Sequence, residues 1–381
     1  MTPHQCTMYI LPLSSMHDQY LSQSLTRSLS CCEWTYTTSI SSPPRILLVT
    51  AEKTNDRSLC DYTEKLVWSG KLSQIIIDEV HIYLTHKYFR ECMRDMVWVG
   101  QLGIQVVLQT GTVSEAMVPL LFKKFGVTVY RICRGPIVWS NILLNATLVE
   151  AEHEVKREVL IRYQRARENN PSGVTLIFCW TKSDTDELSC ELSIARYHAG
   201  MPVEERDMVM DGLKSRVILA IACTSLLGVA LDLSNVVCGI HFGYPWNMVD
   251  YMQEIGRLGW APGCMADSWV VAWRGFQEKY PDDDIFGAKQ VRYAVDQLSY
   301  CQQKPLSDFF DGLSMPCGMH GRVANVCDNC RNGCHMPAST SCKWLYIQVI
   351  FINILQSITR DFTLVLPLSS YLHSYTHLHS P

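Results

Sequence analysis

Short apolar runs alternate with amphipathic stretches along most of this chain. Residues 46–50 and 105–108 are runs of strand length rich in β-branched side chains, and residues 174–179 and 236–241 repeat the pattern. Apolar runs of about four to eight residues are typical of strands buried on both faces, as in parallel sheets. The stretches between these runs carry apolar residues at helical spacing. The alternation predicts an α/β fold built on parallel sheets with helices on both faces.

One of these runs is followed by a cluster of chemically useful side chains. Residues 75–77 are three isoleucines, and Asp78, Glu79 and His81 come directly after them. In an open parallel sheet, ligands bind beyond the carboxyl ends of the strands. An aspartate there can hold Mg²⁺ through water, and a neighbouring glutamate can orient or deprotonate an attacking water. Taken alone, these residues favour a strand followed by a solvated acidic turn, and only the order of the segments downstream favours a metal site.

The pattern along the chain predicts two lobes and a smaller C-terminal unit. An amphipathic helix over residues 150–169 ends at Asn-Asn-Pro-Ser-Gly, and a second strand–helix alternation follows. We expect a first lobe over residues 45–150, a second over 151–285 and a small subdomain over 286–342. Residues 1–44 show no clear period and are typical of a disordered leader or of sequence foreign to the domain. Residues 343–381 are left unassigned.

Composition and charge place this chain among globular proteins. Of its 381 residues, 48% are hydrophobic and 18% charged, which argues against overall disorder. The formal net charge of -4 gives no global basic field, so a nucleic-acid-binding surface would have to be local. Residues 1–11 lack the basic and apolar regions of a secretory signal. We therefore expect the 17 cysteines to be reduced thiols of an intracellular protein.

Six segments follow one another in a specific order. They are Asp78-Glu79-Val80-His81, residues 108–112, residues 176–188, residues 196–201 with Tyr-His-Ala-Gly-Met, residues 223–232 and residues 253–259. Together they resemble motifs II to VI of the RecQ-like DNA helicases of the DEAD/DEAH superfamily. A single match of this kind is weak, but six in the right order are specific. The resemblance covers residues 46–330.

The resemblance implies two RecA-like lobes that clamp ATP and move 3′ to 5′ along one DNA strand. It implies that Asp78 holds Mg²⁺, that Glu79 positions the water and that His81 links the ATP site to the DNA-binding loops. The other implied site residues are Thr110 and Thr112 for lobe closure, Gly228 and Asp232 at the interlobe cleft, Gln253 in motif VI, and Arg257 facing the triphosphate. ATP and Mg²⁺ are the implied cofactors, and single-stranded DNA and duplex junctions the implied partners. A nuclear location and a role in DNA repair or recombination follow from the family alone.

Two departures from the family pattern bear on catalysis. The sequence contains no Gly-x-x-x-x-Gly-Lys-[Ser/Thr] loop, whose backbone amides would cradle phosphates. Residues 69–73 come nearest, but Leu72 occupies the hydroxyl position. Trp260 stands where motif VI has its second arginine, and an arginine finger is worth about 10³–10⁵ in rate. We therefore expect an incomplete first lobe and impaired ATP hydrolysis.

These departures leave alternative interpretations open. The chain is either an incomplete version of an active helicase or a non-catalytic remnant that binds nucleic acid through its second lobe. An RNA helicase of the same superfamily is disfavoured by the Tyr-His-Ala-Gly-Met segment and by the C-terminal cysteines.

Four of those cysteines have the spacing of a zinc site. They are Cys301, Cys317, Cys327 and Cys330, and the last two form a Cys-x₂-Cys knuckle. The arrangement resembles the zinc-binding subdomain that follows the second lobe in RecQ proteins. Cys317 is the least secure ligand, Cys334 and His335 are competitors, and free thiols in a loop are the alternative.

The C-terminal tail contains an apolar stretch over residues 344–355. A membrane span needs about 20 apolar residues. We therefore expect a buried helix or a pair of strands here, and no membrane anchor.

Overall fold

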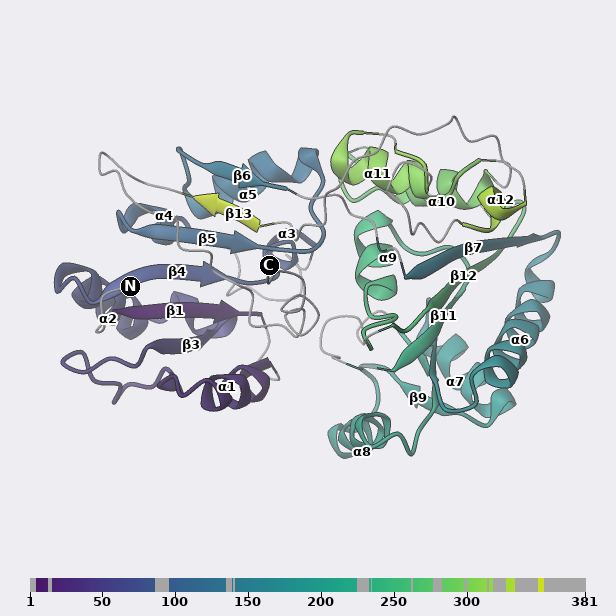
Figure 1. Cartoon of the computed structure of the whole chain (residues 1–381), viewed down its shortest axis with the longest axis horizontal. Coiled ribbons are helices and arrows are strands. Elements are labelled where there is room, and N and C mark those ends of the chain that lie inside the picture. The colour runs from purple at the N-terminus through teal and green to yellow at the C-terminus, as the bar shows by residue number, and fades with distance from the viewer. Residues whose placement is uncertain are drawn as a thin grey trace, which may run out of the picture. The chain divides into compact units, whose positions relative to one another are not determined.

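The computed structural model describes residues 5–12, 16–85, 96–134, 139, 141–224, 233, 235–261, 263–276, 283–297, 300–313, 315–317, 327–332 and 349–352. The chain divides into two compact units. Unit 1 comprises Met1–Gly135 with Tyr346–Pro381, and unit 2 comprises Pro136–Leu345. Figure 1 shows that a sheet with helices around it forms the body of each unit.

Unit 1 is built on a seven-stranded sheet with the order β2-β3-β1-β4-β5-β13-β6. Its strands are β1 (Cys6–Leu11), β2 (Cys31–Glu33), β3 (Ile46–Thr50), β4 (Leu72–Ile77), β5 (Gln105–Gln109), β6 (Arg131–Cys133) and β13 (Val349–Ile352). The five strands from β2 to β5 in this order run parallel, whereas β13 pairs antiparallel with β5 and β6. The carboxyl ends of the parallel strands therefore meet at one edge, as expected from the apolar runs.

Strand β1 lies between β3 and β4, and all six of its residues are buried. The structure thus differs from the expectation of a leader over residues 1–44, because described residues in this range contribute β1, α1 and β2 to the first lobe. The strand is hard to read from sequence because Thr7 interrupts its short apolar run. Its hydrogen-bonding partners also lie far downstream, so no local pattern marks it as a central strand.

The helices of unit 1 pack around its sheet. They are α1 (His17–Thr26), α2 (Arg57–Trp68), α3 (Ile82–Thr85), α4 (Val97–Gln101) and α5 (Val118–Phe125), with short 3₁₀ turns at Ala51–Asn55 and Glu115–Met117. Helix α2 begins after Asp56, whose side chain accepts a hydrogen bond from the Ser58 backbone N–H at 2.8 Å. Tyr20 and Leu21 of α1 pack against a buried cluster that includes Leu11 and Ile76. That contact fixes α1 on the sheet.

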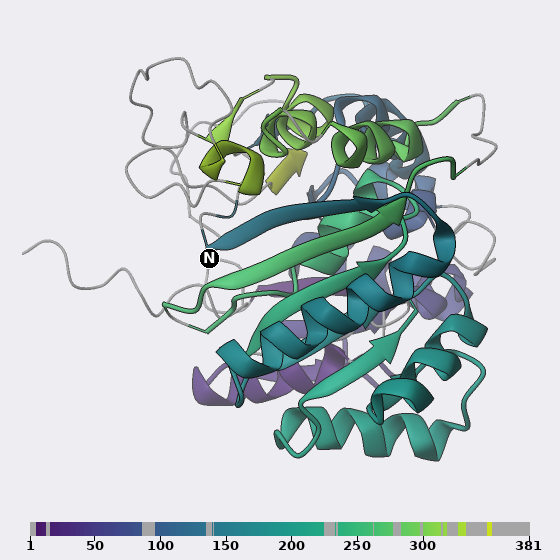
Figure 2. The ribbon, with the colours of Figure 1, turned by 90° about the vertical axis from the view of Figure 1, so that its right-hand side faces the viewer.

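Unit 2 is built on a six-stranded parallel sheet with the order β7-β12-β11-β8-β10-β9. Its strands are β7 (Ile142–Val149), β8 (Val174–Phe178), β9 (Ala195–Tyr197), β10 (Ala220–Cys223), β11 (Val236–Phe242) and β12 (Ala266–Trp273). Its helices are α6 (Glu152–Asn169), α7 (Lys182–Leu192), α8 (Val203–Lys214), α9 (Met248–Ile255), α10 (Ala288–Asp296), α11 (Gln303–Asp311) and α12 (Asp328–Arg331). Figure 2 shows α6 lying across one face of this sheet, where Val155 and Val159 enter the core.

Strand β7 differs from its expected place in the first lobe. It pairs with β12 along its whole length, from Ile142 opposite Ala266 to Val149 opposite Trp273. The division between the units therefore falls after Gly135, not near residue 150. An apolar run predicts that a strand is buried but not which sheet it joins, and β7 joins a strand far downstream.

Together the two sheets confirm the α/β fold class. Helices α10 and α12 contact β7 at the edge of the unit 2 sheet. In the part of the chain that the structure describes, every helix is too short or too polar to span a membrane.

Candidate functional site

The acidic turn after β4 is held between the two neighbouring strands. The Asp78 backbone N–H donates to the Ile10 carbonyl at 3.0 Å, and the Val80 N–H donates to the Gln109 carbonyl at 3.0 Å. Glu79 lies in the left-handed region with φ of 48°, which is uncommon for a residue with a side chain. These bonds fix Asp78 and Glu79 at the carboxyl edge of the sheet, where the sequence predicts them.

Both oxygens of the Asp78 carboxyl group accept hydrogen bonds. The Glu79 backbone N–H donates to Oδ1 at 2.9 Å, and the Tyr20 hydroxyl donates to Oδ2 at 3.0 Å. Burial, helped by the charge of Glu79, raises the pKa of Asp78 to about 6, although the hydrogen bond from Tyr20 opposes the shift. Tyr20 could not be predicted as a site residue from the sequence, because a tyrosine on an amphipathic helix carries no motif.

His81 connects the turn after β4 with the end of β5. Its Nδ1 lies 3.0 Å from Thr110 Oγ1 and 3.2 Å from Glu79 Oε2. The Thr112 backbone N–H donates to Thr110 Oγ1 at 3.1 Å. His81, Thr110 and Thr112 are all buried. The structure therefore brings the predicted residues of motifs II and III into one hydrogen-bonded group within unit 1.

In unit 2, α9 carries the predicted motif VI residues. Gln253 and Arg257 are partly buried, at the C-terminal end of α9 and just after it. The neighbouring Glu254 is buried and its Oε2 lies 2.9 Å from Nε2 of buried His241 on β11. This pair ties α9 to the centre of the sheet, and sequence patterns alone did not single it out. Trp260, at the second arginine position, donates from its indole nitrogen to the Gly256 carbonyl.

Two predicted residues of motif V, Gly228 and Asp232, lie outside the described residues. The Tyr-His-Ala-Gly-Met segment begins at Tyr197, the last residue of β9. Its His198 accepts a hydrogen bond from the Gly200 N–H at Nδ1, 3.1 Å away, and Nε2 lies 2.9 Å from Asp186 Oδ1. Since Nδ1 accepts, Nε2 carries the proton of the neutral ring. This hydrogen bond with His198 lowers the pKa of Asp186, as does Arg196 at 2.7 Å.

The four C-terminal cysteines come together in unit 2. The sulfur atoms of Cys301, Cys317, Cys327 and Cys330 all lie within 4.8 Å of one another. Four sulfurs bound to a tetrahedral Zn²⁺ at about 2.3 Å would lie about 3.8 Å apart, so the cluster fits this ion. A Zn²⁺ ion would bind these cysteines as thiolates. The predicted ligand set is thus geometrically compatible with zinc, Cys317 included.

The two residues inside the knuckle attach this cluster to the rest of unit 2. Asp328 Oδ2 accepts from the Ala146 backbone N–H on β7 at 3.1 Å, and Oδ1 accepts from the Gln302 amide at 2.7 Å. Asn329 donates to the carbonyls of Gln297 and Tyr300 at 3.2 and 2.7 Å. The edge strand β7 is therefore hydrogen-bonded to the cysteine subdomain.

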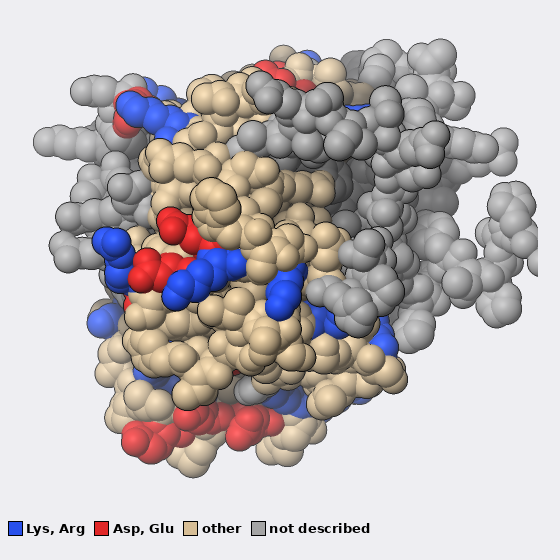
Figure 3. All heavy atoms as spheres, turned by 90° about the vertical axis from the view of Figure 1, so that its left-hand side faces the viewer, with Lys and Arg blue, Asp and Glu red and all other residues tan. Residues whose placement is uncertain are grey.

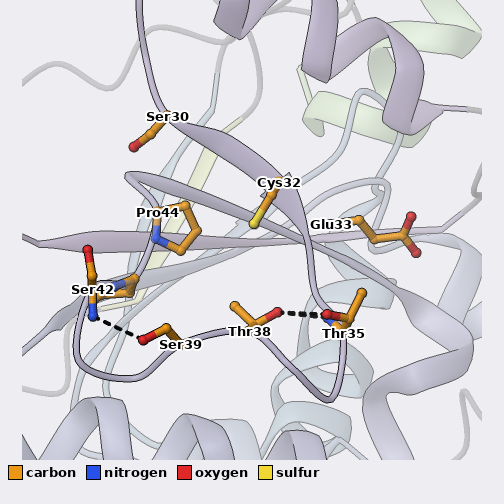
Figure 4. Close-up of a pocket in the computed structure, with 9 residues that line it drawn as sticks. Ser30, Cys32, Glu33, Thr35, Thr38, Ser39, Ser42 and Pro44 are labelled. Atoms are coloured by element: carbon orange, nitrogen blue, oxygen red, sulfur yellow. Dashed lines mark hydrogen bonds between the residues drawn. The ribbon is translucent and has the colours of Figure 1, made fainter.

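A polar hollow of about 470 Å³ lies elsewhere in unit 1, in the loop between β2 and β3. Figure 4 shows its hydroxyl side chains, among them Thr35, Thr38 and Ser39, and the carboxylate of Glu33. None of the sequence-predicted site residues lines it. Figure 3 shows one face of the molecule, on which acidic and basic side chains are interspersed, in keeping with the small net charge.

Comparison with known proteins finds similarity to helicases over part of this chain. Residues 155–261 match the model of the helicase conserved C-terminal domain. The chain is 27% identical over 202 residues to the ATP-dependent helicase wrn-1 of Caenorhabditis elegans, covering 47% of this chain and 19% of that protein. It is 24% identical over 234 residues to mouse ATP-dependent DNA helicase Q5, covering 56% of this chain and 23% of that protein. Over these stretches the chain is similar to helicases of the RecQ type.

Solved structures are similar to this chain in fold. The Mycobacterium smegmatis helicase Lhr bound to ssDNA and AMP-PNP matches with a TM-score of 0.54 and 18% identity, covering 78% of this chain and 43% of that one. The DEAD-box helicase Mss116 bound to ssRNA and UDP-BeF matches with a TM-score of 0.54 and 15% identity, covering 77% and 69%. Both sheets thus resemble RecA-like helicase lobes. The chain spans about a fifth of the length of wrn-1 and Q5.

Proposed function

We propose that this chain carries the core of an ATP-dependent DNA helicase of the RecQ type, which couples ATP hydrolysis to 3′–5′ unwinding. The observation that carries the proposal is the hydrogen-bonded group of His81, Thr110 and Thr112. It joins the acidic turn after β4 to the end of β5. A rigid link between two strand ends is what a protein needs to couple an ATP site with a nucleic-acid site.

The residues of the acidic turn fit a Mg²⁺–ATP site. Mg²⁺ is commonly held through one or two carboxylates together with substrate phosphates, and Asp78 offers one such carboxylate at a strand end. Bound Mg²⁺ would neutralise charge on the phosphoryl group being transferred. Glu79 would orient the attacking water, and Arg257 would place a cation at the triphosphate. The proposed Zn²⁺ at the four cysteines would be structural, since a set of four thiolates leaves no open position.

We further propose that this chain alone hydrolyses ATP slowly. Its sequence has Trp260 in place of the second motif VI arginine and no phosphate-binding loop. Loss of one arginine finger costs about 10³–10⁵ in rate. The alternative, a protein that binds nucleic acid without turnover, is favoured by the same two observations.

Hydrolysis and DNA binding by the full chain distinguish these two functions. We expect ATP hydrolysis that single-stranded DNA stimulates and that Asp78→Ala abolishes, with DNA binding retained in the variant. Hydrolysis that Asp78→Ala leaves unchanged would show that the acidic turn is not the active site. DNA binding with no hydrolysis above background would establish the non-catalytic alternative.

The choice of DNA as the substrate, and a nuclear location, rest on the RecQ-like relatives. Among the structural neighbours, one is bound to ssDNA and another to ssRNA. Competition between single-stranded DNA and RNA of the same sequence tests the choice, and we expect DNA to bind more tightly.

A further inference from the structure

The contact between Tyr20 and Asp78 links a helix outside the predicted motifs to the proposed metal ligand. Tyr20 lies on α1, and its hydroxyl donates to Asp78 Oδ2 at 3.0 Å. The other carboxylate oxygen already accepts from the Glu79 backbone N–H at 2.9 Å. In this arrangement a hydrogen-bond donor faces each oxygen of the carboxylate through which a divalent cation would bind.

The position of Tyr20 is set by packing. Its ring lies 5.5 Å from the ring of Tyr9, measured between centroids, with the planes at 51°. Both rings belong to the apolar cluster that also includes Leu11 and Ile76, so α1 presents the hydroxyl to Asp78 from a fixed direction. A phenol carries its proton at neutral pH, so Tyr20 acts as the hydrogen-bond donor to Asp78.

We propose that Tyr20 is a positioning residue that holds Asp78 in a cation-free arrangement, and that a divalent cation must displace its hydroxyl to bind. The inference rests on the proposed role of Asp78 as the metal ligand. A cation and a phenolic proton compete for the same electron pairs of Oδ2. A cation therefore cannot approach this oxygen from the side on which the Tyr20 hydroxyl donates. The Tyr20 hydroxyl thus acts as a latch on the site, referred to below as the Tyr20 latch.

The size of the effect follows from the strength of the bond that is lost. A hydrogen bond to a charged group contributes about 1.5–3 kcal/mol, which corresponds to a change of about ten- to a hundred-fold in a binding constant. Removing the hydroxyl therefore strengthens cation binding by about ten-fold or more. A tyrosine that merely packed in the core would leave cation affinity unchanged when its hydroxyl was removed.

Mn²⁺ binding to the full, zinc-loaded chain without nucleotide tests the latch, because free Mn²⁺ is quantified directly by electron paramagnetic resonance. We expect Tyr20→Phe to bind Mn²⁺ about ten-fold more tightly than the unmodified protein. Tyr9→Phe is the matched control, since Tyr9 shares the cluster but not the hydrogen bond, and its affinity should equal that of the unmodified protein. Asp78→Asn should remove the binding and so defines the background. If Tyr20→Phe does not fold, Tyr20→Leu replaces it with the same expected direction.

The possible results separate the latch from the proposed function. Equal Mn²⁺ affinity in Tyr20→Phe and the unmodified protein, weaker binding in Tyr20→Phe, or no binding above background in any variant would each overturn the latch. Tighter binding in Tyr20→Phe supports the latch even if DNA stimulates no ATP hydrolysis. In that case the helicase proposal alone fails.

Discussion

Asp328, between the last two cysteines of the cluster, accepts a hydrogen bond from the backbone N–H of Ala146 at 3.1 Å. Ala146 lies on β7, the edge strand of the unit 2 sheet. An edge strand has backbone groups without a neighbouring strand, and here one of them bonds to the knuckle. A change in the arrangement of the four cysteines should therefore alter the stability of the second lobe.

Metal removal should therefore destabilise unit 2. We expect about one Zn²⁺ per chain and a melting temperature that falls when a strong chelator removes it, because structural zinc contributes directly to folding free energy. Cys327→Ser should lose the metal, whereas Cys190→Ser, at an exposed thiol outside the cluster, should keep it. Metal content near zero in freshly purified, reduced protein would contradict the zinc assignment.

Asp328→Ala should lower stability without loss of zinc. The change leaves the half-buried Ala146 N–H and the amide of buried Gln302 without this acceptor, and an unsatisfied buried donor costs about 1–3 kcal/mol. Urea denaturation measures the free energy of unfolding, and elemental analysis measures the zinc. Asp61→Ala, at an exposed helical site of unit 1, is the control and should change stability little. A variant that lost its zinc would assign Asp328 to the metal site itself.

Thr110→Ala should weaken the coupling between DNA and ATP. It removes the hydroxyl that bonds to His81 and accepts from the Thr112 N–H. We expect the stimulation of ATP hydrolysis by single-stranded DNA to fall about ten-fold, because a small misplacement of catalytic groups lowers the rate strongly. Nucleotide affinity should stay within about two-fold of that of the unmodified protein. Thr37→Ala, at an exposed position, is the comparison. Unchanged stimulation in Thr110→Ala would remove the support for the proposed link.

Glu254→Ala should destabilise the second lobe strongly. It leaves buried His241 without the partner that lies 2.9 Å from its Nε2. Breaking a buried pair by removing one member costs about 3–5 kcal/mol where the group left behind is charged, and less where it is neutral. Urea denaturation should show a loss of at least about 2 kcal/mol by the same argument. Glu168→Ala, at an exposed position of α6, should stay within about 0.5 kcal/mol.

The sequence predicted the strands that consist of one clean apolar run. Residues 46–50 correspond to β3, residues 174–179 extend one residue beyond β8, and residues 236–241 fall within β11. Residues 6–11 and 142–149 were harder, because their places in the sheets depend on partners distant in sequence. A local pattern of apolar residues predicts that a strand is buried. Which strands it pairs with depends on the whole fold.

The same distinction applies to the site. Asp78, His81 and Thr110 could be chosen because each stands at the end of an apolar run within a known motif order. Tyr20 and His241 could not, because their roles come from contacts across the sheet that no spacing encodes. The Cys-x₂-Cys spacing marked the cysteine cluster, but not the hydrogen bond between Asp328 and β7.

Glu79 shows how stability and chemistry can oppose each other in this chain. Its left-handed backbone, with φ of 48°, costs a residue with a side chain about 1 kcal/mol, a cost that glycine avoids. Selection for stability alone would therefore favour glycine at this position. A glutamate that persists here among natural variants of this sequence would mean that its carboxylate is retained for what it does and not for how the chain folds.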